Sequence, residues 1–351
     1  TFQYIMSYLA HIIQKPHIKT AVCLALQSKQ GGGKGIILKL MAAIIGDNHY
    51  SQNSNANHIF GDFNGLLEGK VLINLDEAFW GGDKKLEGNI KNKITEDKQS
   101  INKKNINHYN INDFCNYIIS TNSDWFAGVE EGDRRYYCTQ LSNKYSGRST
   151  AETEAYYNPI LAVSPEAFAK VLYNWDLTNF NPRKFGKTKL LQDQVERNWN
   201  SVKIWWNSVM KDGGFMVDDE FIEYNTLMKN KESYGKYIGG EYIVNKKKKL
   251  KMTAYHKDWI HSVYKAQCVS NAYEKVFGLS AFYRDFYKHC LESQPEQKIQ
   301  KNGTRRFYLL LPDINIAREK WNELQEFNYE YNDDDADEWE IDNDCDISDD
   351  E

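Results

Sequence analysis

A glycine cluster followed by a lysine is the first feature of the chain that could do chemistry. Residues 30–35 read QGGGKG and follow an apolar run that ends at Leu26. Backbone N–H groups in a glycine loop, together with the start of a helix, bind anions such as phosphate. Lys34 would reach the β- and γ-phosphates of a nucleotide. The sequence therefore predicts a strand, a phosphate loop and a helix, with the nucleotide-binding residues Gln30, Gly31, Gly32, Gly33, Lys34 and Gly35.

The loop departs from the usual spacing G-x-x-x-x-G-K-[S/T] in two places. Ser28 stands where the first glycine is usual, and Gly35 stands where a Ser or Thr normally holds Mg²⁺. Ile36 offers no hydroxyl either. Taken alone, the stretch favours nucleotide binding over a glycine-rich turn without a ligand. The interpretation requires further nucleotide-site residues elsewhere in the chain.

Two carboxylates follow the next apolar strand. Residues 71–75 read VLINL and precede Asp76 and Glu77, 42 residues after Lys34. Such a strand delivers its acids to the C-terminal edge of a parallel sheet, where ligands bind in open α/β folds. Asp76 would hold Mg²⁺, directly or through water, and Glu77 would polarise the attacking water. The alternative is a buried strand that ends in two solvated acids.

Two further strands carry polar residues at their ends. Residues 117–120 precede Asn122, which could hydrogen-bond the γ-phosphate or the attacking water, although an Asn also commonly begins a turn. Arg134 and Arg135 directly precede an apolar strand at 136–139. They could form ordinary ion pairs, whereas in a ring-shaped ATPase they would reach a neighbour's γ-phosphate as arginine fingers.

Basic residues recur in two predicted hairpins. Residues 100–111 are expected to form one hairpin, with Lys103, Lys104 and His108 at or near its tip. Asn302-Gly303 is a strong turn signal for a second hairpin, which carries Arg305 and Arg306. Because two amphipathic helices precede the second hairpin, residues 252–327 have the order of a winged helix. Both hairpins are predicted to bind DNA.

Composition and charge indicate the class of partner, the redox state of the cysteines and whether the chain could span a membrane. From Glu330 to Glu351 the chain has thirteen acidic residues and no Lys or Arg, and without that tail the formal net charge of −5 becomes +8. A basic body favours a nucleic-acid partner, and the tail is expected to be disordered. Six cysteines without a C-x-x-C pair indicate reduced, intracellular thiols. No apolar run is long enough to span a membrane.

Other stretches receive plainer interpretations. Helices are predicted over 1–14, 159–177 and 188–210, with Trp199, Trp205 and Trp206 in a core. Residues 211–251 contain glycine pairs and the lysine run Lys246–Lys249, and they are predicted to be a solvated link, which beside a DNA-binding module would add phosphate contacts. The spacing of five His and Cys residues matches no common zinc site, so no zinc is predicted at His256, His261, Cys268, His289 and Cys290.

In this order the motifs resemble the primase–helicase family of phages, poxviruses and other large DNA viruses, whose motor is a superfamily 3 helicase of the AAA+ class. Within it, the sequence looks like the C-terminal part of a primase-polymerase from a deep-sea vent phage. The resemblance covers residues 1–327. It is carried by QGGGKG at 30–35, FNGLLEGKVLINLDEA at 63–78, Ile94-Thr95, Lys103-Lys104, STN at 120–122, DRR at 133–135 and WDLTNFNP at 175–182.

The resemblance implies an α/β fold with an AAA+ P-loop NTPase core, a C-terminal winged-helix-like α+β domain and a disordered acidic tail. The expected divisions are 1–18 (remnant of a collar helix), 19–145 (ATPase core), 146–251 (helical extension and basic linker), 252–327 (winged-helix-like domain) and 328–351 (tail). Because the chain begins mid-protein in this comparison, a primase-polymerase domain is expected upstream.

The resemblance also implies a mechanism. ATP and Mg²⁺ would lie between the subunits of a homo-hexameric ring, in the cytoplasm of the infected host cell. Lys34, Asp76, Glu77 and Asn122 would act in cis, and Arg134 or Arg135 in trans. The first hairpin would line the pore and grip single-stranded or forked DNA. Replication proteins would bind the acidic tail.

Two functions of different classes compete. The first is an ATP-dependent replicative DNA helicase or translocase. The second is a non-motor DNA-binding replication scaffold whose loop binds nucleotide but hydrolyses it weakly. A P-loop kinase of small molecules is less favoured, because it explains neither Asn122 nor the paired arginines nor the basic hairpin.

Overall fold

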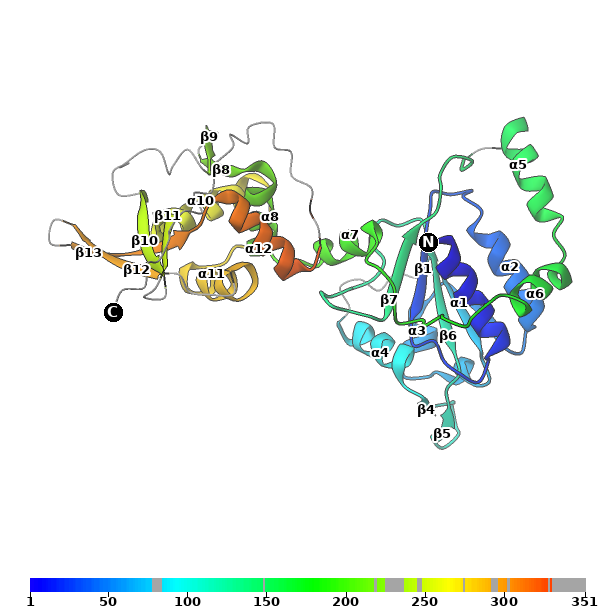
Figure 1. Cartoon of the computed structure of the whole chain (residues 1–351). Helices are drawn as coiled ribbons and strands as arrows, with labels where there is room; N and C mark the ends of the chain where they lie inside the picture. Colours follow the sequence, from blue (N-terminus) through cyan, green and yellow to red (C-terminus); the bar gives the residue numbers. More distant parts are fainter. Residues whose placement is uncertain are drawn as a thin grey trace, which may run out of the picture. The chain divides into compact units, whose positions relative to one another are not determined.

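The structure is a computed structural model, in which the chain forms two compact units, Thr1–Trp199 and Asn200–Glu351 (Figure 1). It describes residues 1–77, 84–147, 149–217, 220–224, 237–244, 248–273, 275–291, 296–301, 304–327 and 329. The predicted acidic tail, from residue 330 onward, lies outside the described residues. None of the described helices has the length and apolar character needed to cross a membrane. The five described cysteines are all buried.

A five-stranded parallel sheet forms the centre of the first unit. Its spatial order is β2 (Tyr50–Asn53), β3 (Leu72–Asp76), β6 (Asn116–Thr121), β1 (Cys23–Gln27) and β7 (Tyr136–Gln140). Every residue of β1 and β6 is buried, as expected for strands covered on both faces. Because the strands run in one direction, all their C-terminal ends share one edge, and β6 lies between β1 and β3.

Seven α-helices are described in the first unit. They are α1 (Phe2–Gln14), α2 (Lys34–Ile45), α3 (Ala56–Phe60), α4 (Lys84–Thr95), α5 (Ala151–Leu161), α6 (Pro165–Tyr173) and α7 (Lys189–Arg197), with a 3₁₀ turn at Gly65–Leu67. The apolar spacing predicted for the first helix is realised, because Leu9 and Ile12 pack in one cluster with Leu24, Met41 and Leu172. This cluster joins α1, α2 and α6 to the sheet.

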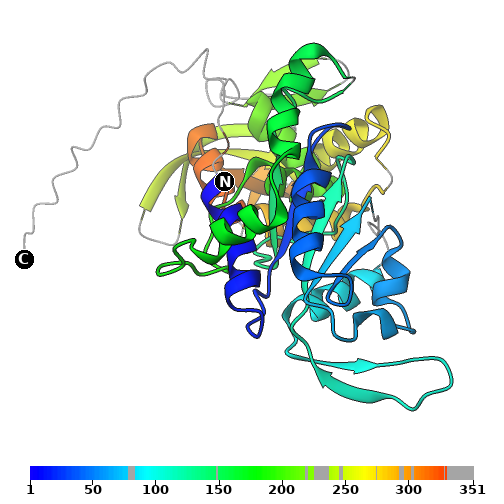
Figure 2. The ribbon, with the colours of Figure 1, turned by 90° about the vertical axis from the view of Figure 1, so that its right-hand side faces the viewer.

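A hairpin leaves this unit between β3 and β6. Its strands are β4 (Lys98–Ile101) and β5 (Tyr109–Asn112), which pair in antiparallel register. The hairpin predicted over residues 100–111 is therefore present, and Figure 2 shows it extending clear of the sheet. The hairpin joins the sheet at the N-terminal end of β6, whereas the phosphate loop follows the C-terminal end of β1. The two segments therefore lie at opposite ends of the parallel strands.

The predicted bounds of two helices are wrong. The single helix expected over 188–210 is two helices, α7 and α8 (Ser201–Asp212), because the Asn200 side chain caps a new helix by accepting bonds from Val202 N and Lys203 N. The helix expected from Pro159 begins at Ala151, after a capping box in which Thr150 and Thr153 bond each other's backbone N–H. It ends at Leu161, and α6 is separate.

The second unit is built around a four-stranded antiparallel sheet. Its order is β10 (Tyr237–Val244), β11 (Lys248–His256), β13 (Thr304–Leu311) and β12 (Glu296–Lys301), beside a smaller hairpin of β8 (Gly214–Val217) and β9 (Glu220–Glu223). Its helices are α8, α10 (Lys257–Ser270), α11 (Leu279–Phe286) with a π-helical turn at Tyr287–Leu291, and α12 (Ile314–Gln325).

Aromatic side chains fill the core of this unit. Trp205 lies edge-on to Phe282, and Trp206 lies edge-on to Phe286 with ring centroids 4.9 Å apart. The prediction that Trp205 and Trp206 are core residues is confirmed, since both side chains are fully buried. Trp199, also predicted as core, is buried at the end of the first unit.

The link predicted over 211–251 is wrong, because most of its described residues lie in strands β8 to β11. The helix, helix and hairpin order of residues 252–327 is present, and Lys301 pairs with Thr304 as the predicted turn requires. The hairpin is nevertheless half of a four-stranded sheet, whose other half comes from the predicted link. Lys246, Lys247, Asn302 and Gly303 lie outside the described residues, as do the side chains of Arg305 and Arg306.

Candidate nucleotide-binding site

The glycine loop connects β1 to α2 and has a backbone that requires glycine. Gly31 and Gly33 have φ angles of +78° and +82°, which side-chain-bearing residues rarely adopt. A Cβ at Gly32 would lie 2.4 Å from Ser28 Oγ. Gly33 has no side chain with which to cap α2. The start of α2 therefore has no side-chain cap that would compete with an anion, and of its first N–H groups Ile36 N donates to Gly33 O at 3.0 Å.

Lys34 is the first residue of α2, and its side chain turns back over the loop. Its Nζ donates to Ser28 O at 3.1 Å, to Ser28 Oγ at 3.0 Å and to Asn122 Oδ1 at 2.5 Å. Partial burial lowers the pKa of the Lys34 ammonium, and the charges of Glu77 and Asp76 act in the opposite direction. The ammonium is thus held at the loop beside two carboxylates.

Asp76 ends β3 at the same edge of the sheet, and Glu77 directly follows it. Asp76 accepts hydrogen bonds from Ser120 Oγ at 2.7 Å and Gln52 Nε2 at 2.7 Å. Glu77 has a φ of +52°, an uncommon conformation for a residue with a side chain. Such outliers cost of order 1–3 kcal/mol and gather at functional sites.

Asn122 connects the lysine to the glutamate. Its side-chain oxygen accepts from Lys34 Nζ, and its backbone N–H donates to Glu77 Oε2 at 3.0 Å. Thr121 Oγ1 donates to the same carboxylate at 3.1 Å. Because β6 lies between β1 and β3, the residue that follows β6 must lie between the loop and the acids. The structure therefore brings together Lys34, Asp76, Glu77 and Asn122.

A segment not predicted to belong to the site holds the loop in place. Lys29 N donates to Asn143 Oδ1 at 2.8 Å, and Gly147 N donates to Gln30 O at 3.0 Å. Tyr157, on α5, donates its hydroxyl to Gly31 O at 3.1 Å. Three consecutive loop residues are thus bonded by residues 143–157. These bonds involve the loop's main chain, so no local pattern in the sequence could reveal them.

The residues at this edge fit an Mg²⁺ ion. Mg²⁺ keeps several waters and needs only one or two carboxylates beside the substrate phosphates. Asp76 supplies a carboxylate, and Ser120 and Gln52 orient it. Among the described residues, no three His, Cys, Asp or Glu side chains are grouped closely enough to form an all-protein metal site.

The paired arginines lie at the opposite edge of the sheet. Arg134 and Arg135 precede β7, and Arg135 O accepts from Cys23 N, at the start of β1, at 2.7 Å. Arg135 contacts Asp133 at 3.4 Å, whereas Arg134 is exposed. Lys34 lies beyond the other end of β1. The arginines therefore do not join the phosphate loop of their own chain.

Of the basic residues predicted at the hairpin tip, two are exposed and one is held in an ion pair. Lys103 forms an ion pair with Glu68, which also accepts from Tyr109 Oη at 2.6 Å. Lys104 and His108 are exposed at the tip. Of the three, Lys104 and His108 are therefore exposed to solvent, while Lys103 secures the hairpin to the preceding loop.

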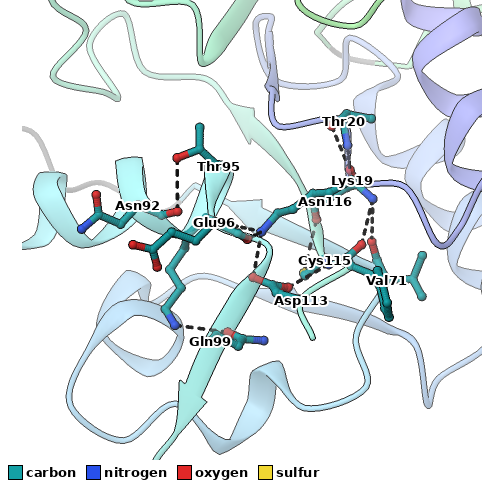
Figure 3. Close-up of polar contacts among 12 residues, drawn as sticks. Lys19, Thr20, Val71, Asn92, Thr95, Glu96, Gln99, Asp113, Cys115 and Asn116 are labelled. Carbon is teal, nitrogen blue, oxygen red and sulfur yellow. Dashed lines mark hydrogen bonds and ion pairs between the residues drawn. The ribbon is translucent and has the colours of Figure 1, made fainter. Parts of the chain in front are cut away.

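A buried ion pair ties the base of the hairpin to the sheet (Figure 3). Lys19 Nζ lies 2.7 Å from Asp113 Oδ2, and the two side chains are 4% and 1% exposed. Lys19 also donates to the carbonyl of Lys93, in the last turn of α4, and to that of Glu96, which directly follows the helix. Beside it, Thr20 donates twice to the side-chain oxygen of Asn116, at 2.9 and 2.8 Å. The N-terminal ends of β1 and β6 are therefore linked through polar side chains.

Comparisons with known proteins find one family model and one curated relative that match parts of the chain. A family of unknown function (DUF5906) matches residues 26–135, which contain the loop, both acids, Asn122 and the arginines. The DNA primase-polymerase of Nitratiruptor phage NrS-1 is 30% identical over 170 residues, or 48% of this chain. The chain spans 23% of the length of that relative.

Solved structures extend the similarity to most of the chain. An apo structure of the NrS-1 C-terminal region (305–718) has a TM-score of 0.61 at 20% identity, covering 87% of this chain and 70% of that one. A second apo structure of that region, the A form, has a TM-score of 0.58 at 19% identity with the same coverage. The predicted resemblance to a phage primase-polymerase is confirmed in sequence, while its helicase part stays a prediction. The chain therefore shares the fold of the C-terminal region of the NrS-1 protein.

Proposed function

We propose that the chain is the ATP-driven motor of a phage replication protein, a superfamily 3 type helicase or translocase of the AAA+ class. It would move single-stranded DNA through a homo-hexameric ring. The observation that carries the proposal is the chain of contacts from Lys34 through Asn122 to Glu77 at one edge of a parallel sheet. The similarity to a phage primase-polymerase supports a role in DNA replication.

Each residue has a distinct part in ATP hydrolysis. The loop N–H groups and the Lys34 ammonium would bind the β- and γ-phosphates, and Lys34 would exchange its bond to Asn122 for one to phosphate. Glu77 would orient the attacking water and accept its proton, while Asn122 would hold that water or the γ-phosphate. Mg²⁺, held by Asp76 and water, would neutralise the phosphate charge.

The arginines would complete the site from a neighbouring subunit. They lie at the sheet edge opposite Lys34, so they cannot serve their own phosphate loop, whereas a ring brings one subunit's edge to the next subunit's nucleotide. Arg134 is exposed, so it is the better candidate for the arginine finger. Arg135 is paired with Asp133.

The hairpin would bind DNA, and the sheet would transmit structural changes at the nucleotide site to it. β5 leads through Asp113 into β6, which ends one residue before Asn122. Lys19 precedes β1, which ends at the phosphate loop. Because Lys19 and Asp113 are paired in a buried site, a change at the nucleotide edge would reach the hairpin through two strands rather than through a flexible loop.

Lys104→Ala is expected to weaken binding of single-stranded DNA. The substitution removes an exposed cation at the hairpin tip, so log K against log salt should become less steep by about 0.7, the value for one lost phosphate contact. Fluorescence anisotropy of a labelled oligonucleotide at several salt concentrations measures both effects. Lys39→Ala, which removes an exposed lysine from α2, is the matched control. Equal DNA affinities for the two variants would contradict the assignment of the hairpin.

Gly35→Ser is expected to lower the Mg²⁺ concentration needed for half-maximal ATP hydrolysis. Apart from its two chain neighbours and the backbone of its own helix, no atom lies within 4 Å of a Cβ added at Gly35, so a serine fits and restores the hydroxyl of the usual loop. Titrating Mg²⁺ in a hydrolysis assay measures the change. Gly88→Ser, at an equally open glycine in α4, is the control, since both substitutions stabilise a helix by about 0.5 kcal/mol. An equal Mg²⁺ requirement in both variants would contradict the role of this position.

A non-motor replication scaffold is the second candidate, because Gly35 leaves the loop without its usual Mg²⁺ ligand. It would bind DNA through the second unit and partner proteins through the acidic tail, and its nucleotide would turn over weakly. ATP hydrolysis measured with and without single-stranded DNA separates the two functions. The motor requires stimulation by DNA, and the scaffold does not.

A further inference from the structure

An apolar cavity of about 420 Å³ lies beside the glycine loop. One wall consists of Gly32, Gly33, Ile36 and Ile37, from the loop and the first turns of α2. The other includes Tyr145, which follows β7, and Tyr156 of α5. The volume is within the range of small-molecule sites, which are mostly apolar with few polar groups. None of the contacts that hold the catalytic carboxylates uses this cavity.

The tyrosines of the cavity are fixed by one another and by the loop. The rings of Tyr145 and Tyr156 stack with centroids 4.0 Å apart and planes 18° apart. The ring of Tyr157 stands edge-on to Tyr156, and its hydroxyl bonds Gly31 O. α5 has no buried residue, and Tyr156 is 45% exposed, so a ligand can reach this wall. The result is an aromatic surface that is hydrogen-bonded to the phosphate loop through Tyr157.

The position of the cavity matches the shape of a nucleotide. Gly32 and Gly33 belong to both the phosphate loop and the cavity wall. The cavity then extends along α2 to Leu40, six residues or about 9 Å beyond Lys34. A nucleotide whose phosphates lie on the loop would pass its sugar across Ile36 and Ile37. Its base would then face Tyr145 and Tyr156 on the opposite wall.

We propose that this cavity binds the base of the nucleoside triphosphate, which stacks against Tyr156. The inference rests on the proposed function, because it assumes that the loop binds the phosphates. Most side chains of the lining are apolar or aromatic, so the cavity recognises the flat face of a base more than its hydrogen-bonding edge. ATP and GTP are therefore expected to bind with similar affinity, and both more tightly than inorganic tripolyphosphate, which has no base.

Tyr156→Ala tests the proposal by its selective effect. The affinities of the full chain for ATP and for inorganic tripolyphosphate are measured by calorimetry with Mg²⁺ present. Loss of one base–aromatic stack is expected to weaken ATP binding by about 5- to 150-fold and to leave tripolyphosphate binding unchanged. Tyr156→Phe should restore ATP binding. Val163→Trp, which fills the cavity from its exposed rim, should act like Tyr156→Ala.

The control is Tyr173→Ala, which removes a 70% exposed tyrosine outside the cavity and should change neither affinity. The inference is overturned if wild-type protein binds tripolyphosphate as tightly as ATP, or if Tyr156→Ala and Val163→Trp both bind ATP normally. In these cases the phosphate loop and the proposed function stand. If wild-type protein binds neither compound, the proposed function fails together with this inference.

Discussion

Lys34→Ala is expected to weaken ATP binding by about 10- to 150-fold and to reduce hydrolysis to the background rate. The ammonium of Lys34 is held over the loop by Ser28 and Asn122, where it can move to the β- and γ-phosphates. A hydrogen bond to a charged group contributes about 1.5–3 kcal/mol, which corresponds to this change in affinity. Equilibrium titration with a fluorescent ATP analogue measures binding, and phosphate release measures hydrolysis.

Lys39→Ala is the matched control for this prediction, because Lys39 is an exposed lysine on the same helix. It should bind and hydrolyse ATP as the wild-type protein does. Thermal unfolding of both variants shows whether either substitution disturbs α2. A folded Lys34→Ala protein with wild-type affinity for ATP would show that the glycine loop does not bind the nucleotide.

Glu77→Gln is expected to reduce ATP hydrolysis by about 10²- to 10⁴-fold, the usual contribution of a general base. The amide keeps an oxygen that can accept from Asn122 N and Thr121 Oγ1, so the geometry is retained while the negative charge is lost. ATP binding should therefore persist. Single-turnover hydrolysis and nucleotide titration on the same protein separate the two effects.

Glu130→Gln is the control, since Glu130 is an exposed carboxylate paired with Lys91. It should leave the hydrolysis rate unchanged. Hydrolysis by Glu77→Gln at the wild-type rate would show that another residue activates the water. In that case the left-handed conformation of Glu77 would need a different explanation.

Much of the candidate site at the C-terminal edge of the sheet could be predicted, because its sequence signals are local. The glycines that the loop backbone requires stand next to Lys34, and the acids directly follow a continuous apolar strand. Once these strands are assigned to a parallel sheet, the residues at their C-terminal ends must gather at one edge. The contacts among Lys34, Asn122 and Glu77 are therefore a consequence of strand order.

The residues that were missed lack such signals. Gln52 lies on β2, an edge strand that is only partly buried. Its sequence YSQN is therefore polar and lacks the apolar run that marks a core strand. Asn143, Gly147 and Tyr157 act on the main chain of a loop more than a hundred residues earlier in the sequence. Their partners depend on tertiary packing, which hydrophobic periodicity does not describe.

The second unit was harder to predict for a different reason. Residues 237–256 contain a glycine pair and a lysine run, which indicate a solvated link, yet their backbones pair over eight positions from Tyr237–Tyr255 to Val244–Lys248. Antiparallel pairing does not require apolar side chains at these positions, because backbone hydrogen bonds hold the strands together. By contrast, the Asn200 cap that divides 188–210 into two helices is a local signal that could have been used.

The central claim is that this chain converts ATP hydrolysis into movement along DNA. Steady-state ATP hydrolysis by the wild-type protein, measured with and without single-stranded DNA, tests it most directly. We predict that DNA accelerates hydrolysis and that the acceleration is weaker in Lys104→Ala. A rate that is the same with and without DNA, or the absence of turnover in the presence of Mg²⁺, would contradict the motor and favour the scaffold.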